Sequence, residues 1–344
     1  MTIVRWAASV LACLAILASR GLADDTWVDI SSSQIDQLSR QPWPGGCAGV
    51  VVNRLTGDVL VNIVGHGLWK SSDRGQTWTR LDGGVVGGRG ECGWSVQVDQ
   101  DDPRRVAVFS LDGDAGYTVD GSRWKKLASL GRNWDFGSID WGSPEARVIL
   151  AGKHESEGEV YKSADGGTTW TKLPIVMDPV RKKDECMIGV MNAETFIYSY
   201  ANGIHRSADS GATWTRVSDS QPRSKIPVRF KNAHYLCTSS GLIVSRDLGK
   251  TWQRLGEPVD IWQGPFFGAD EKTIVAAGPQ GLYKTTDAGT TWTKISGLRP
   301  NTGKNFSFST NWFGTYAWDP VHDVIYATAM SHPAFKRELS TDKE

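Results

Sequence analysis

Short apolar runs alternate with polar turn segments along the chain from about residue 26 onward. The clearest runs are rich in β-branched residues and lie at 59–64, 147–151 and 273–277. Each is followed, after a turn, by a second short run, such as 67–70 or 281–284. Runs of four to six residues bounded by turn residues predict β-strands, and they are too short for the helices of a bundle. The pattern therefore indicates an all-β protein.

An eight-residue motif, Ser/Thr-x-Asp-x-Gly-x-Thr-Trp, separates groups of these strands and is called the repeat motif below. It occurs in full at 71–78, 163–170, 207–214, 245–252 and 285–292, and a copy at 118–124 is one residue short. Its aspartates are 38 to 47 residues apart: Asp73, Asp120, Asp165, Asp209, Asp247 and Asp287. Such a period indicates stacked supersecondary units. Three strands before each motif and one after it predict a four-stranded propeller blade.

The number of blades follows from the two ends of the chain. Six blades that carry the motif account for residues 47–298, and two or three further strands are predicted between 313 and 337. The missing fourth strand is predicted at 26–31, because its Thr-Trp-Val-Asp-Ile-Ser pattern matches Thr-Trp-Thr-Lys-Ile-Ser at 291–296. We therefore predict a seven-bladed β-propeller closed by an N-terminal strand in the last blade, with six blades as the alternative. Closure removes exposed sheet edges.

The repeat motif resembles the Asp-box, or BNR repeat, of β-propellers such as sialidases, sortilin-type receptors, xyloglucan-specific endoglucanases and photosystem II assembly propellers. The resemblance implies a carbohydrate-directed protein of the glycosidase-like or sialidase-like kind. The alternative is a non-catalytic propeller that binds glycans or proteins, or serves in assembly. The arginine triad of sialidases cannot be transferred, because their Phe-Arg-Ile-Pro stretch is absent and residues 226–230 read Ile-Pro-Val-Arg-Phe.

Within the motif, the aspartate is expected to accept hydrogen bonds from its own turn, the glycine to adopt a positive φ, and the tryptophan to pack between sheets. Calcium binding is the alternative, but each turn offers one carboxylate where calcium needs six to eight oxygens. The six histidines are scattered and lack the close spacing of a zinc site. No metal and no cofactor are therefore expected.

The first 23 residues have the pattern of a secretory signal peptide. Arg5 precedes an uncharged apolar run at 6–19, and the small residues Gly21 and Ala23 suit cleavage before residue 24. The run is too short to span a membrane. Cleavage would leave residues 24–344 as a single secreted propeller domain, which we expect to be a monomer. The 38 basic and 38 acidic residues of the chain balance, which argues against a nucleic-acid partner.

Four cysteines remain after residue 23: Cys47, Cys92, Cys186 and Cys237. An even number in an oxidising compartment allows two disulfides, with three connectivities. Their places in adjacent blades favour Cys47–Cys92 and Cys186–Cys237, while Cys92–Cys186 and four buried free thiols stay open as alternatives.

Two faces of the propeller are distinguished by their loops. The repeat motifs and the turns between first and second strands lie on one face, the motif face. The loops between blades and the hairpins between second and third strands lie on the opposite, interblade-loop face, where we expect a ligand site around the channel. Five tryptophans fall where these loops meet inner strands: Trp43, Trp94, Trp134, Trp262 and Trp312.

A pyranose ring has apolar C–H faces and a polar rim, so these tryptophans are candidates for glycan binding; packing between blades is the alternative. Charged candidates in the same loops are Arg89, Glu91, Arg132, Asp135, His154, Glu155, Arg223, Arg229 and Asp260. For glycoside hydrolysis, Asp135 is the preferred general acid, because its aromatic sequence neighbours would raise its pKa, and Glu91 is second. Ordinary salt bridges are the alternative for both.

Overall fold

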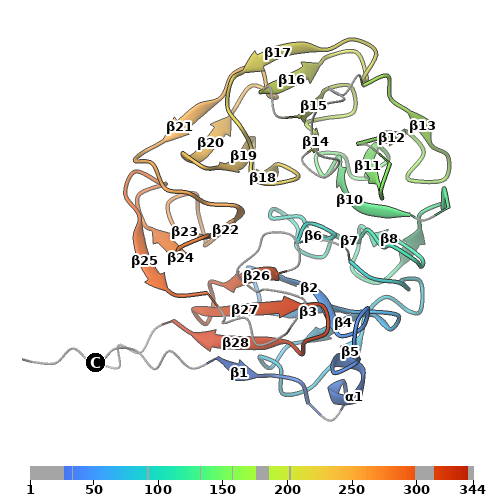
Figure 1. Ribbon diagram of the computed structural model, residues 1–344, viewed down its shortest axis with the longest axis vertical. Coiled ribbons are helices and arrows are strands. Elements are labelled where there is room, and N and C mark those ends of the chain that lie inside the picture. Colours follow the sequence, from blue (N-terminus) through green and yellow to red (C-terminus); the bar gives the residue numbers. More distant parts are fainter. Residues whose placement is uncertain are drawn as a thin grey trace, which may run out of the picture.

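The computed structural model describes residues 27–32, 34–90, 93–131, 133–156, 158–175, 186–200, 203–298 and 314–339. Within these residues the chain forms seven four-stranded antiparallel sheets, which stand as blades around a central channel (Figure 1). The predicted seven-bladed propeller is confirmed, and the six-bladed alternative is wrong. The one helix of the described part, α1 (Asp36–Ser39), is a single turn.

In blades 1 to 6 the strands follow one another from the channel outward. Blade 1 contains β2 (Cys47–Val52), β3 (Val59–Ile63), β4 (Gly67–Ser71) and β5 (Thr79–Arg80). Blade 2 contains β6 (Val96–Val98), β7 (Val106–Val108), β8 (Gly116–Thr118) and β9 (Trp124–Lys126). Blade 3 contains β10 (Trp134–Ile139), β11 (Ile149–Lys153), β12 (Val160–Ser163) and β13 (Thr171–Lys172).

Blade 4 contains β14 (Met187–Val190), β15 (Phe196–Ser199), β16 (Ile204–Ser207) and β17 (Thr215–Ser218). Blade 5 contains β18 (Val228–Phe230), β19 (Ala233–Thr238), β20 (Gly241–Ser245) and β21 (Gln253–Leu255). Blade 6 contains β22 (Gln263–Phe267), β23 (Ile274–Gly278), β24 (Gly281–Thr285) and β25 (Thr293–Ser296).

Blade 7 contains strands from both ends of the described chain. Its order is β26 (Gly314–Asp319), β27 (Val324–Ala329), β28 (Phe335–Glu338) and β1 (Val28–Asp29), with β1 outermost (Figure 1). Val28 lies opposite Lys336 and Asp29 opposite Phe335. The amide of Ile30 extends this pairing by donating to the carbonyl of Ala334 at 3.0 Å.

The inner strands are buried on both faces, because each blade is covered by a neighbour on either side. Every residue of β3 is buried, whereas both residues of the outer strand β5 are exposed. The apolar core is therefore divided into clusters between blades. Phe230 of blade 5 stacks on Phe267 of blade 6 with ring centroids 4.3 Å apart, for example. Burial on both faces explains why the inner strands read as continuous apolar runs.

Polar side chains of the inner strands also join neighbouring blades. Ser95, just before β6, donates to the carbonyl of Asp135 in blade 3 at 2.6 Å. The hydroxyl of Ser138 in blade 3 accepts from the amide of Val190 in blade 4 at 3.0 Å. The amide oxygen of Gln263 in blade 6 accepts from the amide of Tyr316 in blade 7 at 2.9 Å. These bonds satisfy buried polar groups and fix the blades relative to one another.

The repeat motif forms a closed turn between the third and fourth strands. In blade 1, Oδ1 of Asp73 accepts from the amide of Thr77 at 2.8 Å and from the hydroxyl of Ser71 at 2.7 Å, and Oδ2 accepts from the Thr77 hydroxyl at 2.6 Å. The other full copies repeat this pattern. In the short copy, Asp120 accepts from the amide of Arg123 at 2.8 Å. The expected hydrogen bonding within the turn is confirmed.

The glycine of the motif lies against the preceding blade. Gly75 has a φ of 91°, and a Cβ there would come within 2.6 Å of Ile30 in blade 7. Gly167 in blade 3 has a φ of 81°, and a Cβ there would likewise clash with Leu127 at the end of blade 2. A side chain at either position would both strain the backbone and clash. Ile30 thus occupies in blade 7 the position that Leu127 occupies in blade 2.

The favoured disulfide pairings are not formed. Cys47 and Cys237 are buried free thiols, so neither Cys47–Cys92 nor Cys186–Cys237 is present. The pairings fail because the side chains pack in different places: Cys47, Cys186 and Cys237 belong to three different apolar clusters. Burial raises the pKa of the Cys47 and Cys237 thiols, which keeps them protonated and unreactive. Cys92 lies outside the described residues.

Candidate functional site

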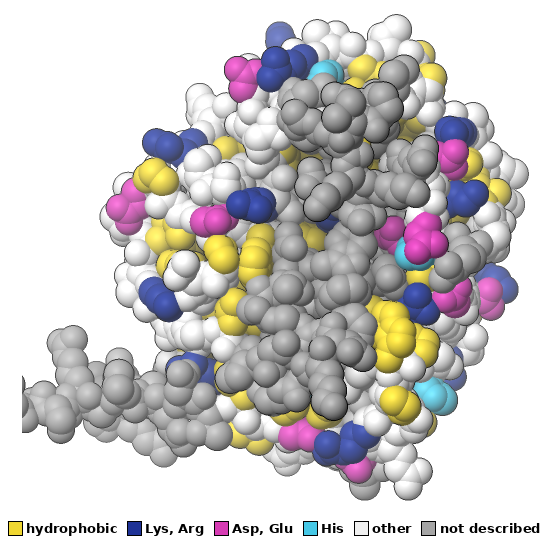
Figure 2. All heavy atoms as spheres, viewed as in Figure 1, with side chains coloured by type: hydrophobic (Ala, Val, Ile, Leu, Met, Phe, Trp, Pro, Cys, Tyr) yellow, Lys and Arg dark blue, Asp and Glu magenta, His cyan; other side chains and the backbone are white. Residues whose placement is uncertain are grey.

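The aspartates of the motif face have their oxygens occupied by hydrogen bonds within their own turns. Hydrogen bonds from Thr77 lower the pKa of Asp73 to about 2, and those from Thr213 lower that of Asp209 to about 2. On the opposite face, which faces the viewer in Figure 2, a histidine lies among acidic and basic side chains over blades 2 and 3. The candidate site is built on this interblade-loop face.

Asp135 and His154 form a tight pair at the interblade-loop end of blade 3. Asp135 lies at a bulge in β10, where the pairing with β11 shifts between Trp134 and Phe136, and His154 follows the end of β11. Oδ1 of Asp135 is 2.6 Å from Nδ1 of His154, and both side chains are about one-tenth exposed. A β-bulge commonly re-aims a side chain beside a functional site. A carboxylate on Nδ1 fixes the ring and leaves Nε2 to meet a proton or a ligand.

The acidic residue beyond this pair is Glu155, whose Oε1 lies 3.6 Å from Nε2 of His154. Glu155 is mostly exposed and has a φ of 48°, in the left-handed region. Such a conformation is uncommon for a residue other than glycine and recurs at functional sites. Imidazole thus stands between a buried and an exposed carboxyl group, an arrangement that can hold and pass on a proton.

Asp135 pairs with His154, while the aromatic residue before it in the sequence makes contacts of its own. Because β10 is bulged at Asp135, the regular alternation of a strand does not decide where its carboxyl group points. Trp134 packs on Trp170, with ring centroids 4.6 Å apart. The carboxylate of Asp135 contacts His154. A catalytic role for Asp135 therefore depends on that histidine and remains a hypothesis.

Trp43 and Arg89 form a second group on the same face. The indole of Trp43 is 42% exposed, and the guanidinium of Arg89 lies over its ring, 5.2 Å from the centroid. Arg89 is in turn bound by Asp112 of blade 2 at 2.7 Å, and its backbone pairs with that of Leu111. A cation on one ring face stiffens the indole and leaves other parts of it open to solvent.

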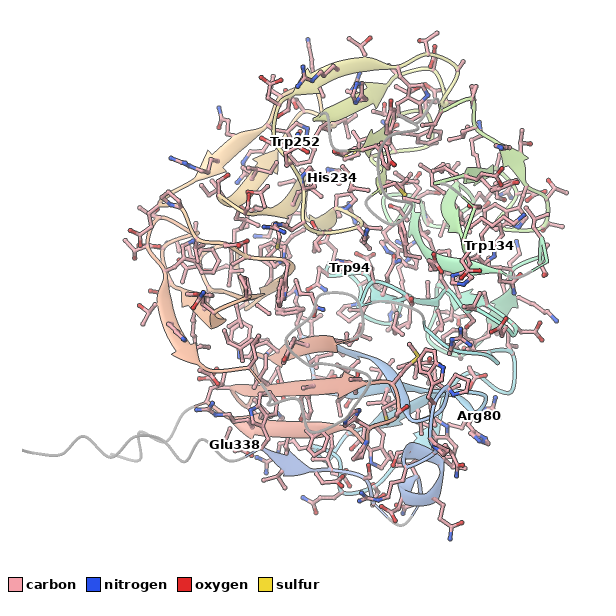
Figure 3. All side chains as sticks on the ribbon, viewed as in Figure 1. Arg80, Trp94, Trp134, His234, Trp252 and Glu338 are labelled. Carbon is pink, nitrogen blue, oxygen red and sulfur yellow. The ribbon has the colours of Figure 1, made fainter. Side chains whose placement is uncertain are left out.

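The remaining predicted tryptophans lie deeper in the molecule. Trp134 is completely buried between blades, which is inconsistent with a stacking platform and matches the packing alternative. Trp94 is 5% exposed and lies at the central channel (Figure 3). Trp262 is partly buried against the core of blades 6 and 7. Trp312, Glu91 and Arg132 lie outside the described residues.

The other charged and histidine side chains of these loops make a surface ion pair or a backbone contact. Arg223 and Asp260 are 3.6 Å apart at the surface. His332 is buried, with Nδ1 3.0 Å from the carbonyl of Met330. No group of three or more His, Cys, Asp or Glu side chains suited to a metal ion occurs among the described residues.

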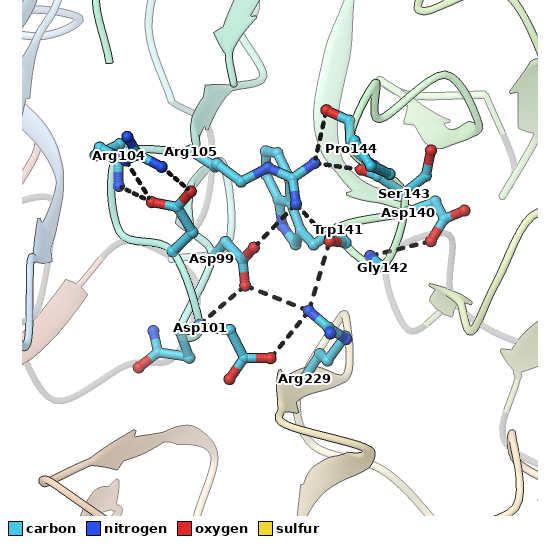
Figure 4. A network of polar contacts seen from close by, with 12 residues as sticks. Asp99, Asp101, Arg104, Arg105, Asp140, Trp141, Gly142, Ser143, Pro144 and Arg229 are labelled. Atoms are coloured by element: carbon cyan, nitrogen blue, oxygen red, sulfur yellow. Dashed lines mark hydrogen bonds and ion pairs between the residues drawn. The ribbon is translucent and has the colours of Figure 1, made fainter. Parts of the chain in front are cut away.

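Sequence reasoning missed a polar network that crosses the channel at the motif face (Figure 4). Arg229, which we expected in an interblade loop, lies in β18, and its Nη1 is 3.1 Å from Asp101 Oδ2 and 3.6 Å from Asp99 Oδ1 of blade 2. Arg105 binds the same Asp99 at 3.3 Å and the carbonyl of Trp141 in blade 3 at 2.5 Å. Blades 2, 3 and 5 are thus connected across the channel.

Arg54 of blade 1 completes this network. Its Nε donates to the carbonyl of Gln100 in blade 2 at 2.6 Å, and its Nη1 to the carbonyl of Gly268 in blade 6 at 3.1 Å. Its guanidinium also lies 4.8 Å from the centroid of Phe230 in blade 5. We call Arg54, Asp99, Asp101, Arg105 and Arg229 the channel network; it brings opposite blades into contact at the motif-face end of the channel.

Comparison with known proteins finds a relative that is similar in sequence to most of this chain. The chain is 26% identical over 251 residues to a xyloglucanase from Paenibacillus sp., an alignment that covers 72% of this chain and 20% of that protein. The chain therefore spans about a fifth of the length of the curated relative that it matches. No protein-family model matches the chain.

Solved structures of similar fold are less alike in sequence. A GH74 xyloglucanase from Xanthomonas campestris is 16% identical, with a TM-score of 0.46 over 83% of this chain and 49% of that one. A GH74 enzyme from Niastella koreensis is 14% identical, with a TM-score of 0.41 over 86% and 60%. YCF48 from Cyanidioschyzon merolae is 12% identical, with a TM-score of 0.46 over 90% and 98%.

The described residues include no helix that is long and apolar enough to cross a membrane.

Proposed function

We propose that this protein is a secreted, carbohydrate-binding propeller that holds a xyloglucan-type polysaccharide on its interblade-loop face. The observation that carries the proposal is the exposed indole of Trp43, held by Arg89. A flat apolar ring beside charged hydrogen-bonding groups complements the C–H face and hydroxyl rim of a pyranose. The similarity to a xyloglucanase supports the choice of polysaccharide. Secretion rests on the N-terminal apolar run in the sequence.

The position of Trp43 is fixed before a ligand arrives. Arg89 is itself only about one-tenth exposed and is anchored by Asp112, so the cation beneath the indole has little freedom. A side chain that is already ordered loses less entropy on binding than a mobile one. Trp43 therefore suits the role of a stacking platform better than the buried Trp94 and Trp134.

The test is retention by polysaccharide. The mature protein is expected to be retarded in gels that contain tamarind xyloglucan, and Trp43→Ala is expected to lose most of this retardation without a change in melting temperature. Leu55→Ala is the matched control, because Leu55 is also exposed (57%) but follows β2 on the motif face. Equal retardation of Trp43→Ala and the parent protein would place the site elsewhere. If neither xyloglucan nor other glycans retard the parent protein, a protein-binding or assembly module becomes the better interpretation.

A second candidate function, glycoside hydrolysis, is favoured by the Asp135–His154–Glu155 arrangement. Hydrolysis requires two carboxyl groups on either side of the scissile bond. The two carboxyl groups in this arrangement are Glu155, which is mostly exposed, and Asp135, which is about one-tenth exposed and held by His154. Release of reducing ends from xyloglucan that is lost in both Glu155→Gln and Asp135→Asn, with binding retained, would show hydrolysis. Binding without any release would leave the protein as a binding module.

A further inference from the structure

A cavity occupies the central channel between the inner strands of the blades. Its lining is rich in aromatic side chains, among them Trp94, Trp141, Phe266, Tyr316 and Trp318. The centre of a water-sized molecule can occupy about 110 Å³ of it. A single water needs roughly 10–15 Å³ of such space, so the cavity has room for several waters or one small organic molecule.

One polar side chain in the wall of this cavity lacks any hydrogen-bond partner. His234 of β19 is 4% exposed, and neither Nδ1 nor Nε2 has a partner among the described residues (Figure 3). Buried polar side chains in native proteins are nearly always satisfied by protein, water or ligand. His234 thus brings two unsatisfied ring nitrogens to the wall of the cavity.

The charge state of this wall limits the kind of molecule. Burial, and then the positive charge of Arg229, lower the pKa of His234 to about 4, so the ring is neutral at pH 7 and offers one donor and one acceptor. Arg229 is balanced by Asp99 and Asp101. Arg54 is bound to two backbone carbonyls and lies on the same network. Asp140 also lines the cavity, and burial raises the pKa of its carboxyl group. The wall thus carries charges of both signs around a neutral imidazole, which does not favour a free ion.

A hydroxyl group both donates and accepts, as the neutral imidazole of His234 does, and the C–H groups of a small ring suit the aromatic lining. We propose that the channel cavity binds one small neutral polyhydroxyl molecule, a monosaccharide or cyclic polyol, through hydrogen bonds to His234. This site lies in the channel and does not depend on the polysaccharide site at Trp43. A polysaccharide is too large for the cavity, so the two proposals succeed or fail separately.

Binding of D-glucose, D-xylose and myo-inositol to the mature protein is measured by calorimetry and saturation-transfer NMR. At least one is expected to bind saturably in the millimolar range, while sodium acetate and methylammonium chloride do not. His234→Phe keeps a ring of similar shape but removes both nitrogens, and it is expected to weaken binding roughly tenfold, as for the loss of a hydrogen bond. Leu55→Ala, on an exposed loop, should bind as the parent does.

The fold should tolerate His234→Phe, because an apolar ring replaces an unpartnered polar one. Unchanged affinity in His234→Phe, or preferential binding of acetate, would overturn the proposal. A crystal of the parent protein soaked in glucose tests it without any substitution: density for a sugar at His234 supports the proposal, and ordered waters alone refute it.

Discussion

The carboxylate of Asp209 shows how a single residue closes a turn of this propeller. Its oxygens accept from the amide of Thr213 at 2.9 Å, from the Thr213 hydroxyl at 2.6 Å and from the Ser207 hydroxyl at 2.7 Å. All three donors lie within four residues, so the turn satisfies itself without help from another blade. Its function is therefore structural, although the side chain is polar and at the surface.

At this scale we predict that Asp209→Ala lowers the melting temperature by several degrees, because three hydrogen bonds to the carboxylate are lost. Retention by xyloglucan well below the melting temperature should be unchanged, since Asp209 lies on the motif face and the proposed polysaccharide site lies on the interblade-loop face, at the other end of the strands. Asp219→Ala is the control on the same blade: Asp219 is 89% exposed and makes a surface ion pair with Arg216 at 2.7 Å. A melting temperature for Asp209→Ala equal to that of Asp219→Ala would contradict the structural role.

The short strand β1 is the element that joins the two ends of the described chain in one blade. It has only two paired residues, but Ile30 after it is 5% exposed and belongs to the cluster between blades 7 and 1. The indole nitrogen of Trp78 donates to the carbonyl of Ile30 at 3.2 Å. The repeat motif of blade 1 is therefore hydrogen-bonded to the end of the outer strand of blade 7. The stability of this junction thus depends on packing more than on strand pairing.

For this element we predict that Ile30→Ala lowers the free energy of unfolding by about 2–4 kcal/mol, the usual cost of truncating a buried isoleucine. Val28→Ala in the same strand should change it by less than about 0.5 kcal/mol, because Val28 is 50% exposed. Chemical denaturation with intrinsic tryptophan fluorescence measures both.

Deletion of residues 24–31 should have a larger effect than Ile30→Ala, because it also exposes the edge of β28. If the truncated protein melts within a degree or two of the mature chain, the closure of blade 7 by the N-terminal strand has no role in stability.

At the scale of the whole molecule, the channel network connects blades 1, 2, 3, 5 and 6 across the channel. Arg229 and Arg54 reach from their own blades to residues on other sides of the channel, so the ring is held at its centre as well as between neighbours. Burial raises the pKa of Asp99, a member of the network, and that of Asp140 close to it. Removal of one partner would leave the others buried and unpaired, which is the costly case.

The acid sensitivity of the molecule follows from the groups whose pKa is lowered. His234 has a pKa of about 4 in the folded protein, below the ordinary 6.5, so between these values the unfolded chain binds the extra proton and stability falls as pH falls. The aspartates of the repeat motif, such as Asp73 and Asp287 with a pKa of about 2, add stability above pH 3.8 that is lost as pH falls toward 2. The raised pKa of Asp99 and Asp140 acts in the opposite sense.

We therefore predict two acid steps in the stability of the mature protein, measured by denaturation from pH 7 to pH 2. His234→Phe should reduce the step between pH 6.5 and 4 by up to about 3 kcal/mol, and burial of His205, which also lowers its pKa, accounts for part of what is left. The step below pH 3.8 should be the same in both proteins, because the motif turns are unchanged. An undiminished upper step in His234→Phe would assign that proton uptake to another group.

The candidate site could be predicted only in part. Asp135, His154, Arg89 and Trp43 were found because loops between blades can be located from the repeat. The pairing of Asp135 with His154, 19 positions away in the sequence, depends on a bulge in β10, and the local sequence pattern does not predict that bulge. His234 and Arg229 were missed as a pair for the same reason, since their surroundings come from blades 2, 3 and 5.

The sequence by itself determined the seven blades, their four strands and the hydrogen-bonded turn at each repeat motif. The physical reason is locality: a motif turn is satisfied by atoms within about five residues, and its regular recurrence sets the size of a blade. Only the tertiary structure decided which tryptophans are buried, that Cys47 and Cys237 stay free thiols, and that arginines cross the channel. These outcomes depend on which face of a strand meets the neighbouring or opposite blade, and residues far apart in sequence set that contact.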